Sequence, residues 1–367
     1  MKILYTCTYS AGISGVWNRV YNLSKEMIRK GHEVNVFSSN LVAGTDKHAK
    51  PYELINRIKV YRFPVKLKIS DNASFWAGKK FKESLEKIKP DVIDCQTYRH
   101  PETTAALKIA KKLNIPCILT THAPFVEKAA RGLKLNLLAF VYDILIGKKA
   151  LDSFDKIVAI SKWEIPYLIK LGVKKENIEI ISNGISPKFF KVKSSNKLSV
   201  IYLGRIAPIK NLEMILDLAK KFPELKFKIK GPIQKGYSLK SKSNNLAILN
   251  QRYSLGEELK ELSKASIFIL PSKREGIPQA LIEAMAAGLI VISSSTQGGK
   301  ELVKDSKNGF LFEIGNEKEL EKKLAFCIRN FKKLKRIRNN SRKAAGNYNL
   351  EKIADRIENL YKLLISR

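Results

Sequence analysis

Short apolar runs alternate with helical patterns along the whole chain. The first repeat of this pattern is the clearest: Ile3–Thr8 predicts a strand, Gly12–Gly15 a turn and Val34–Phe37 a second strand. Between the turn and the second strand lies an apolar stripe at helical spacing, formed by Val16, Val20, Leu23, Met27 and Ile28, which Gly31 can cap. Strands that alternate with helices favour parallel sheets covered on both faces.

The pattern continues and then restarts. Further strands of the first half are predicted at Val92–Cys95, Cys117–Thr120, Ile157–Ile160 and Ile178–Ile181. After a basic, apolar-poor stretch, the second series is predicted at Val200–Leu203, Phe227–Ile229, Leu246–Leu249, Ile267–Leu270 and Ile290–Ile292. The tail carries Ile353, Ile357, Leu360 and Leu364 at helical spacing. We therefore predict two α/β domains, residues 1–187 and 188–349, followed by a C-terminal helix over 350–367.

The segment after the strand Ile267–Leu270 carries the most informative chemistry. Glu275 lies in the predicted loop, and Glu283 lies eight positions later, about two turns into the predicted helix. Open parallel sheets bind ligands at the carboxyl ends of their strands, which favours a binding site here. The alternative is a solvated acidic pair beside a buried helix.

This Glu-x7-Glu pattern, followed by Ala-Met-Ala-x-Gly, resembles the signature of the retaining nucleotide-sugar glycosyltransferases of family 4. Further segments follow in the family's order: Ala11–Val16, Thr121–Ala123, Ser182–Ile185, Gly204–Asn211, and Gly298–Val303 with Asn308–Phe310. The resemblance covers nearly the whole chain. It implies the GT-B fold, in which two Rossmann-like doubly wound domains face each other across a cleft and the C-terminal helix crosses back to the first domain.

The resemblance also implies roles for individual residues. It implies that Glu283 binds the ribose hydroxyls and that Glu275 binds the hydroxyls of the donor sugar. A carboxylate suits both roles, because it can accept two hydroxyl hydrogen bonds at once. It implies that Arg205 and Lys210 bind the leaving diphosphate, because two fixed cations neutralise the negative charge that develops on that group. Two cations in a loop of so basic a chain are otherwise ordinary surface residues. His122 is implied to contact the donor sugar or its phosphate.

Backbone groups complete the predicted donor site. The N–H groups around Ile277 and Gln279, at the start of a helix, can hold the sugar or a phosphate. Gly12 and Gly15 lie between a strand and a helix, where free N–H groups and the helix dipole favour an anion. Glycines that serve only a tight turn are the alternative. A dinucleotide site is disfavoured, because the G-x-G-x-x-G spacing is missing and the second strand ends without an acidic residue.

The implied reaction moves a sugar to an acceptor hydroxyl with retention of anomeric configuration. A covalent intermediate needs a carboxylate beside the anomeric carbon, and no residue is an evident candidate. No Asp-x-Asp motif occurs, so we expect Arg205 and Lys210 to act without a metal and without a cofactor beyond the donor. Asn250–Ser254 departs from the family's usual base-contacting form, so UDP-, GDP- and ADP-sugars all stay open.

Composition adds a second theme, which is positive charge. The chain has 367 residues, 44% of them apolar, enough for two cores. Its 68 Lys and Arg residues against 34 Asp and Glu give a net charge of +34, which attracts anionic lipid headgroups or polyanions. A Lys-rich compositional bias is the alternative. The four cysteines lack metal or disulfide spacing, which favours reduced thiols.

The acceptor is expected on the first domain. Basic Lys128, Arg131 and Lys134 are interspersed with apolar residues up to Val141, a mixture that fits a membrane interface or a buried helix with a basic edge. Phe75, Trp76, Lys79 and Lys80 form a similar mixture. No apolar stretch reaches membrane-spanning length, and Met1–Tyr5 begins a strand rather than a signal peptide.

These features predict a cytoplasmic, peripheral membrane glycosyltransferase with a lipid or lipid-linked glycan acceptor. A soluble sugar or sugar-phosphate acceptor is the alternative. A nucleic-acid-binding protein on the same scaffold is less favoured, because no recognised nucleic-acid motif occurs and Lys is spread along the chain.

Overall fold

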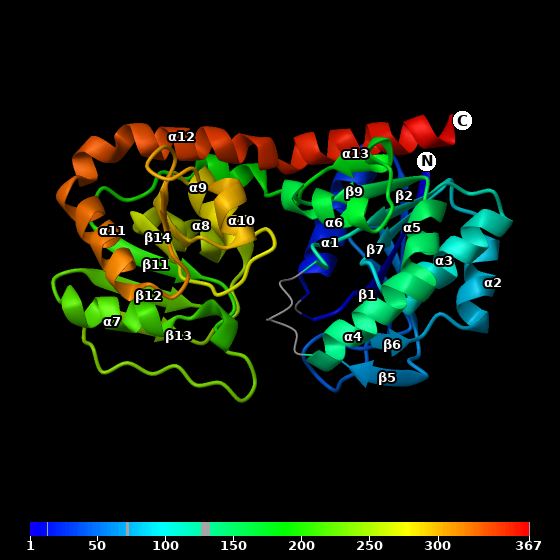
Figure 1. Cartoon of the computed structure of the whole chain (residues 1–367), viewed down its shortest axis with the longest axis horizontal. Coiled ribbons are helices and arrows are strands. Elements are labelled where there is room, and N and C mark those ends of the chain that lie inside the picture. Colours follow the sequence, from blue (N-terminus) through cyan, green and yellow to red (C-terminus); the bar gives the residue numbers. More distant parts are fainter. Residues whose placement is uncertain (13, 71–72, 126–132, 367) are drawn as a thin grey trace. The chain divides into compact units, whose positions relative to one another are not determined.

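The computed structural model describes residues 1–12, 14–70, 73–125 and 133–366. The chain forms two compact units. The first comprises Met1–Gly184 together with the chain from Leu350 onward, and the second comprises Ile185–Asn349. Figure 1 shows that helices flank the strands of each unit.

The first unit is built on an eight-stranded sheet with the order β10-β9-β8-β7-β1-β2-β4-β3. The strands are β1 (Lys2–Tyr9), β2 (Glu33–Ser39), β3 (Tyr52–Ile55), β4 (Ile58–Phe63), β7 (Val92–Gln96), β8 (Cys117–Thr120), β9 (Lys156–Ala159) and β10 (Ile178–Ile180). Neighbouring strands are parallel except β3 and β4. A separate two-stranded ribbon pairs β5 (Leu67–Ser70) with β6 (Ala73–Phe75).

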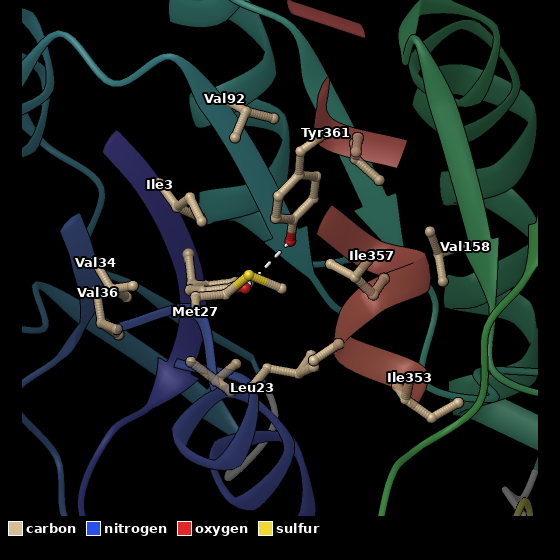
Figure 2. Packing of buried hydrophobic residues seen from close by; sticks show 14 of the residues in the cluster. Ile3, Leu23, Met27, Val34, Val36, Val92, Val158, Ile353, Ile357 and Tyr361 are labelled. Atoms are coloured by element: carbon tan, nitrogen blue, oxygen red, sulfur yellow. Dashed lines mark hydrogen bonds between the residues drawn. The ribbon is translucent and has the colours of Figure 1, made fainter. Parts of the chain in front are cut away.

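Both faces of this sheet are covered, because successive residues of a strand point to opposite sides. In β1, Ile3 and Tyr5 join the core under α1 (Gly15–Arg29) and α13 (Leu350–Ile365), whereas Leu4 joins the core on the other face. That second core packs against α2 (Lys79–Ile88), α3 (Pro101–Lys112), α5 (Lys148–Ser153) and α6 (Ile165–Lys170). Figure 2 shows residues of α13 beside Leu23 and Met27 of α1. The C-terminal helix is thus part of the first unit, as the sequence predicts.

The second unit contains a six-stranded parallel sheet with the order β13-β12-β11-β14-β15-β16. The strands are β11 (Ser199–Leu203), β12 (Lys226–Lys230), β13 (Leu246–Leu249), β14 (Ile267–Leu270), β15 (Ile290–Ser294) and β16 (Phe310–Phe312). Its α-helices are α7 (Glu213–Lys221), α8 (Leu255–Lys264), α9 (Gln279–Ala286), α10 (Gln297–Leu302), α11 (Glu317–Arg329) and α12 (Lys335–Ala345). Short 3-10 turns include η6 (Pro208–Lys210) and η7 (Phe331–Leu334).

Every strand predicted from the apolar runs is present, within one or two residues at its ends. The prediction missed β3 to β6 and β16, which are short, partly polar strands toward the edges of the sheets or outside them. All four cysteines are free and buried, although Cys95 and Cys117 lie on neighbouring strands with their sulfurs 3.8 Å apart. Among the described residues, no helix is both long and apolar enough to span a membrane.

Candidate functional site

The second unit brings the predicted cations and one predicted carboxylate to a single point of its sheet. From β11 the chain adds β12 and β13 on one side, and it then returns to add β14 on the other side. The loops that leave two such strands diverge, and open parallel sheets bind ligands at this point. Arg205 and Lys210 follow β11, and Glu275 follows β14.

Lys210 and Glu275 are in direct contact. Lys210 Nζ lies 2.6 Å from Glu275 Oε1, and the Ser272 hydroxyl donates to the same oxygen at 2.6 Å. The two side chains are only 19% and 10% exposed, so little water screens the pair. A backbone hydrogen bond of 2.9 Å from Lys273 to Ile209 ties the two loops together. The ion pair is therefore held in place by the fold.

Arg205 lies beside a tyrosine that the sequence analysis did not single out. The Tyr202 hydroxyl, at the end of β11, donates to the Arg205 carbonyl at 2.8 Å, while the arginine side chain is exposed. Burial, Glu275 and Tyr253 raise the pKa of Tyr202 well above its usual value. Tyr202 thus stays neutral beside the carboxylate. It was missed because a tyrosine in an apolar strand carries no sequence signal of a site.

Glu283, on α9, is paired with a second acid. Its carboxyl group shares a hydrogen bond with Glu258 of α8, and burial together with the Glu258 charge raises the pKa of Glu283 well above its usual value. Burial and the same two carboxylates raise the pKa of Tyr253. Tyr253 comes from the predicted base-contacting segment. Glu258 was not foreseen, because only tertiary packing brings α8 and α9 together.

The start of α9 leaves donors available for a ligand. The helix begins at Gln279, and Pro278 precedes it as the N-cap residue, one position earlier than the first-turn position predicted for it. Ile277 is buried and Gln279 is half-buried. Within the described residues, their backbone N–H groups have no hydrogen-bond acceptor. The first turn holds no acidic side chain, so an anion fits there.

In the first unit, the two loop glycines have different environments. Gly12 has a φ of +82°, and a Cβ at this position would lie 2.5 Å from the Ala43 carbonyl oxygen. A glycine is therefore required at position 12 by the turn alone. At Gly15, the first residue of α1, a Cβ would meet nothing within 4 Å. Ser14 caps this helix through its hydroxyl, and residue 13 lies outside the described residues.

His122 follows β8 and has a φ of 56°. Its Nε2 lies 2.7 Å from Gln96 Oε1, at the end of β7. Burial, with smaller contributions from Arg19 and His100, lowers the pKa of His122 well below its usual value. The imidazole is therefore neutral near pH 7, and its Nε2–H donates to the Gln96 side chain.

The turn that carries His122 is held by a buried glutamate. Glu164 Oε2 accepts hydrogen bonds from the Thr121 hydroxyl at 2.5 Å and from the Ala123 N–H at 3.0 Å. Its Oε1 accepts from the N–H groups of Ile160 and Ser161. Ala123, like His122, has a positive φ, which is costly for a residue other than glycine. The capping pattern Ser-x-x-Glu at 161–164 was the available sequence signal.

A polar cluster surrounds the same edge of the first sheet. The Thr8 hydroxyl donates to the buried Glu102 carboxylate at 2.7 Å and lies 3.0 Å from His100 Nδ1. Arg19 is 3% exposed and donates to the Ser182 carbonyl and to the Asn183 side chain. The sequence offered no context for His100, yet its charge acts on His122. His122 therefore belongs to a larger polar network than the sequence indicated.

The predicted acceptor segment lies partly outside the described residues, since Lys128 and Arg131 fall there. Its continuation is α4 (Leu133–Tyr142), followed by a π-helical segment, η2 (Asp143–Gly147). This continuation exposes large apolar side chains: Leu137, Leu138, Phe140, Val141, Ile144, Leu145 and Ile146. In the similar mixture at residues 75–80, Trp76 is buried and stacks on Phe63, whereas Phe75 is exposed.

The described residues contain no group of three or more His, Cys, Asp or Glu side chains arranged to hold a metal ion. What they bring together in the second unit is a lysine–carboxylate pair, an acid pair and free helix N–H groups. Such a set can bind hydroxyl groups and phosphate oxygens.

Comparisons with known proteins agree with this chemistry. The family Glycosyl transferases group 1 matches residues 186–344, and Glycosyltransferase Family 4 matches residues 13–189. An uncharacterized glycosyltransferase of Haemophilus influenzae is 29% identical, over 97% of this chain and 98% of its own length.

Two relatives carry a lipid in their names. The UDP-Gal:alpha-D-GlcNAc-diphosphoundecaprenol alpha-1,3-galactosyltransferase of Escherichia coli is 27% identical over 76% of each chain. The alpha-monoglucosyldiacylglycerol synthase of Streptococcus pneumoniae is 25% identical over 84% of this chain and 74% of its own length.

Solved structures share the fold. Sucrose-phosphate synthase of Thermosynechococcus elongatus superposes with a TM-score of 0.76 at 16% identity, over 100% of this chain and 99% of its own. HepE of Anabaena in complex with UDP-glucose gives a TM-score of 0.74 at 17% identity, over 98% and 99%.

Proposed function

We propose that the chain, which belongs to the group 1 glycosyltransferases and has their GT-B fold, moves a sugar from a nucleotide diphosphate sugar to an acceptor hydroxyl. The proposed transfer retains the anomeric configuration of the sugar. The observation that carries the proposal is the Lys210–Glu275 pair at the strand-order reversal of the second sheet. The pair places a carboxylate, which can accept hydrogen bonds from sugar hydroxyls, beside a cation, which can bind the diphosphate. A sugar diphosphate needs both kinds of contact.

The donor contacts are proposed as follows. Glu283 accepts hydrogen bonds from the ribose hydroxyls. Tyr253 lies beside Glu283, on the side proposed for the nucleotide base. Glu275 accepts hydroxyls of the donor sugar, and Lys210 and Arg205 bind the diphosphate. The N–H groups of Ile277 and Gln279 add neutral donors. The Anabaena structure with UDP-glucose, which shares the fold, supports a nucleotide sugar as the ligand class.

The proposed chemistry needs no metal. As the glycosidic bond breaks, negative charge develops on the diphosphate, and fixed cations stabilise it most in a site with little water. Lys210 is 19% exposed and already oriented by Glu275, so little reorganisation is required. His122 is proposed to contact the donor sugar or its phosphate as a neutral imidazole. Gly15, at the open start of α1, is the better candidate of the two glycines for a ligand contact.

The acceptor is proposed to be a lipid or a lipid-linked glycan at an anionic membrane surface. The name of one relative gives a diphosphoundecaprenol-linked acceptor, and the name of another gives a glucosyldiacylglycerol as its product. The exposed apolar side chains of α4 and η2 and the net charge of +34 supply the attraction to such a surface. A cytoplasmic location on the inner membrane face follows from this proposal.

The donor proposal is tested by thermal stabilisation with UDP, GDP and ADP. A nucleotide at about 100 times its Kd adds roughly 2.7 kcal/mol to the stability of the folded state. We expect one nucleotide to raise the Tm of the wild type and to have little effect on Glu283→Ala.

Glu224→Ala is the matched control, because Glu224 is an exposed carboxylate of the same unit. It should respond to the nucleotide as the wild type does. No shift with any of the three nucleotides, or an equal shift in Glu283→Ala, would remove the donor assignment.

A further inference from the structure

A cavity in the Ile185–Asn349 unit is strongly basic. It has a volume of about 670 Å³ and lies among α12, the turn η7, the segment before β11 and Gly288, two residues beyond the end of α9. Five cationic side chains line it: Lys193, Lys332, Lys335, Arg338 and Arg342. No acidic residue lines it. Among the described residues, none of the five forms an ion pair with a carboxylate.

The N-terminal end of the helix beside this cavity carries positively charged side chains, which the helix dipole disfavours. Five of the eleven residues of α12 are Lys or Arg and none is acidic. Lys335 and Arg336 open the helix, and Lys332 and Lys333 lie in η7, separated from the helix by Leu334 alone. The N-terminal end of a helix carries partial positive charge, so cations there are unfavourable unless an anion is present. A local rule broken in this way is typical of a functional site.

The two arginines are fixed by the protein, and the lysines are not. Arg338 donates to the Gly288 carbonyl at 2.8 Å and to the Ser194 hydroxyl at 2.5 Å. Arg342 donates to the Ala286 carbonyl at 2.8 Å. Arg342 thereby caps the C-terminal end of α9, and Arg338 holds Gly288, two residues beyond that end, which accounts for the presence of both arginines. Burial and the nearby Arg342 charge lower the pKa of Arg338, as expected for cations without a counter-ion.

Capping does not account for the lysines. Lys193, Lys332 and Lys335 are exposed around the cavity, and all three side chains border the space next to the fixed arginines. Two oriented guanidinium groups with exposed ammonium groups around them form an arrangement that recognises phosphate oxygens.

We propose that this cavity binds a small, multiply charged phosphate-bearing anion. The site is distinct from the donor site: it adjoins the C-terminal end of α9, whereas Glu275 and Gln279 lie at the N-terminal end, about 12 Å away along an eight-residue helix. The cavity volume is in the usual range for small-molecule sites. The anion is either a free phosphoanhydride or the headgroup of a phosphorylated lipid. The proposal does not depend on the donor assignment.

The test measures the Kd of inorganic pyrophosphate by calorimetry and the binding of vesicles that contain phosphatidic acid. The test variant is Lys332→Gln with Lys335→Gln, and the matched control is Lys240→Gln with Lys242→Gln, which removes the same charge from exposed positions of the same unit. Arg205→Gln with Lys210→Gln reports on pyrophosphate at the donor site. Lys193→Gln supplies a second, single-residue test on another segment.

We expect the test variant to raise the Kd of pyrophosphate at the cavity about tenfold, equivalent to about 1.4 kcal/mol. The Arg205 and Lys210 variant should retain this binding event. Loss of vesicle binding without any change for pyrophosphate would support the same site with a lipid headgroup as its ligand. Equal behaviour of the test and control variants toward both probes would overturn the proposal, because the attraction would then be that of the general surface charge.

Discussion

At the scale of single residues, carboxyl groups define the candidate donor site. Glu275 forms an ion pair with Lys210, whereas Glu283 shares a hydrogen bond with Glu258. Two carboxyl groups in direct contact resist ionising together, because their negative charges repel. One of the two therefore keeps its proton to a higher pH. The two glutamates of the Glu-x7-Glu pattern therefore have partners of opposite kind, and the pKa of Glu283 is raised by its burial and by Glu258.

This difference predicts a pH dependence of nucleotide binding. The pKa of Glu283 is raised in the free protein, and its carboxylate form is the better acceptor for ribose hydroxyls. Affinity should therefore rise with pH as Glu283 deprotonates, by at most about tenfold per pH unit below its pKa. In Glu258→Gln, the loss of the like charge lowers the pKa of Glu283, so the rise should move to lower pH.

Calorimetry between pH 5 and pH 8 checks this prediction. The phosphates of the nucleotide titrate identically with both proteins, so the difference between wild type and Glu258→Gln isolates the protein groups. Superimposable pH profiles would show that the acid pair plays no part in binding.

At the scale of elements, α4 and η2 expose several large apolar side chains, whereas Asp143 of η2 is buried. Asp143 is buried and accepts hydrogen bonds from Tyr98 and Arg99, the latter through both carboxylate oxygens. A Cβ at Gly147 would lie 2.2 Å from the Tyr98 hydroxyl oxygen, so only glycine permits this approach. A contiguous set of exposed apolar side chains marks an interaction surface.

We expect this surface to hold the protein on anionic vesicles. Leu138→Glu with Leu145→Glu replaces side chains that are 62% and 72% exposed, and it should reduce co-sedimentation at least about tenfold, because each change removes buried apolar area and adds a repelled charge. The control, Leu54→Glu with Leu67→Glu, changes leucines that are 60% and 57% exposed on other elements. Equal loss in both variants would mean that charge alone, and not the apolar surface, drives binding.

At the scale of the whole molecule, the C-terminal helix completes the first unit. Ile353, Ile357 and Leu364 of α13 are buried in the core formed with α1 and the strands. The Tyr361 hydroxyl donates to Asp94 at 2.7 Å, beneath the sheet center. Figure 2 shows that residues from the two ends of the chain, such as Ile3 and Tyr361, share one core.

Removing one of these contacts should destabilise the first unit. Ile357 is fully buried, and Ile357→Ala should cost about 2 to 5 kcal/mol through lost burial and a residual cavity. Leu363→Ala, on the same helix at 51% exposure, should cost little. Hydrogen exchange resolved by peptide checks the prediction: faster exchange is expected in β1 and α1. Unchanged exchange there would mean that α13 contributes little to the stability of that core.

The sequence by itself determined most of the fold. Parallel strands buried on both faces leave continuous apolar runs, so β1, β7, β11 and β14 were readable from local pattern alone. The edge strands β3 and β16 were not, because half-exposed strands carry weaker patterns. The resemblance to family 4 singled out Glu275, Lys210 and His122, and each lies in the loop after a readable strand, where a doubly wound sheet binds ligands.

Tertiary structure decided what these residues contact. Three contacts join separate elements or segments distant in sequence. Glu283 pairs with Glu258, Glu164 accepts hydrogen bonds from the turn that carries His122, and buried Asp143 accepts hydrogen bonds from Tyr98 and Arg99. The basic cavity likewise gathers Lys193 and α12 from positions more than a hundred residues apart. Local pattern reports the burial of a segment, but electrostatic partners are fixed only when separate elements pack.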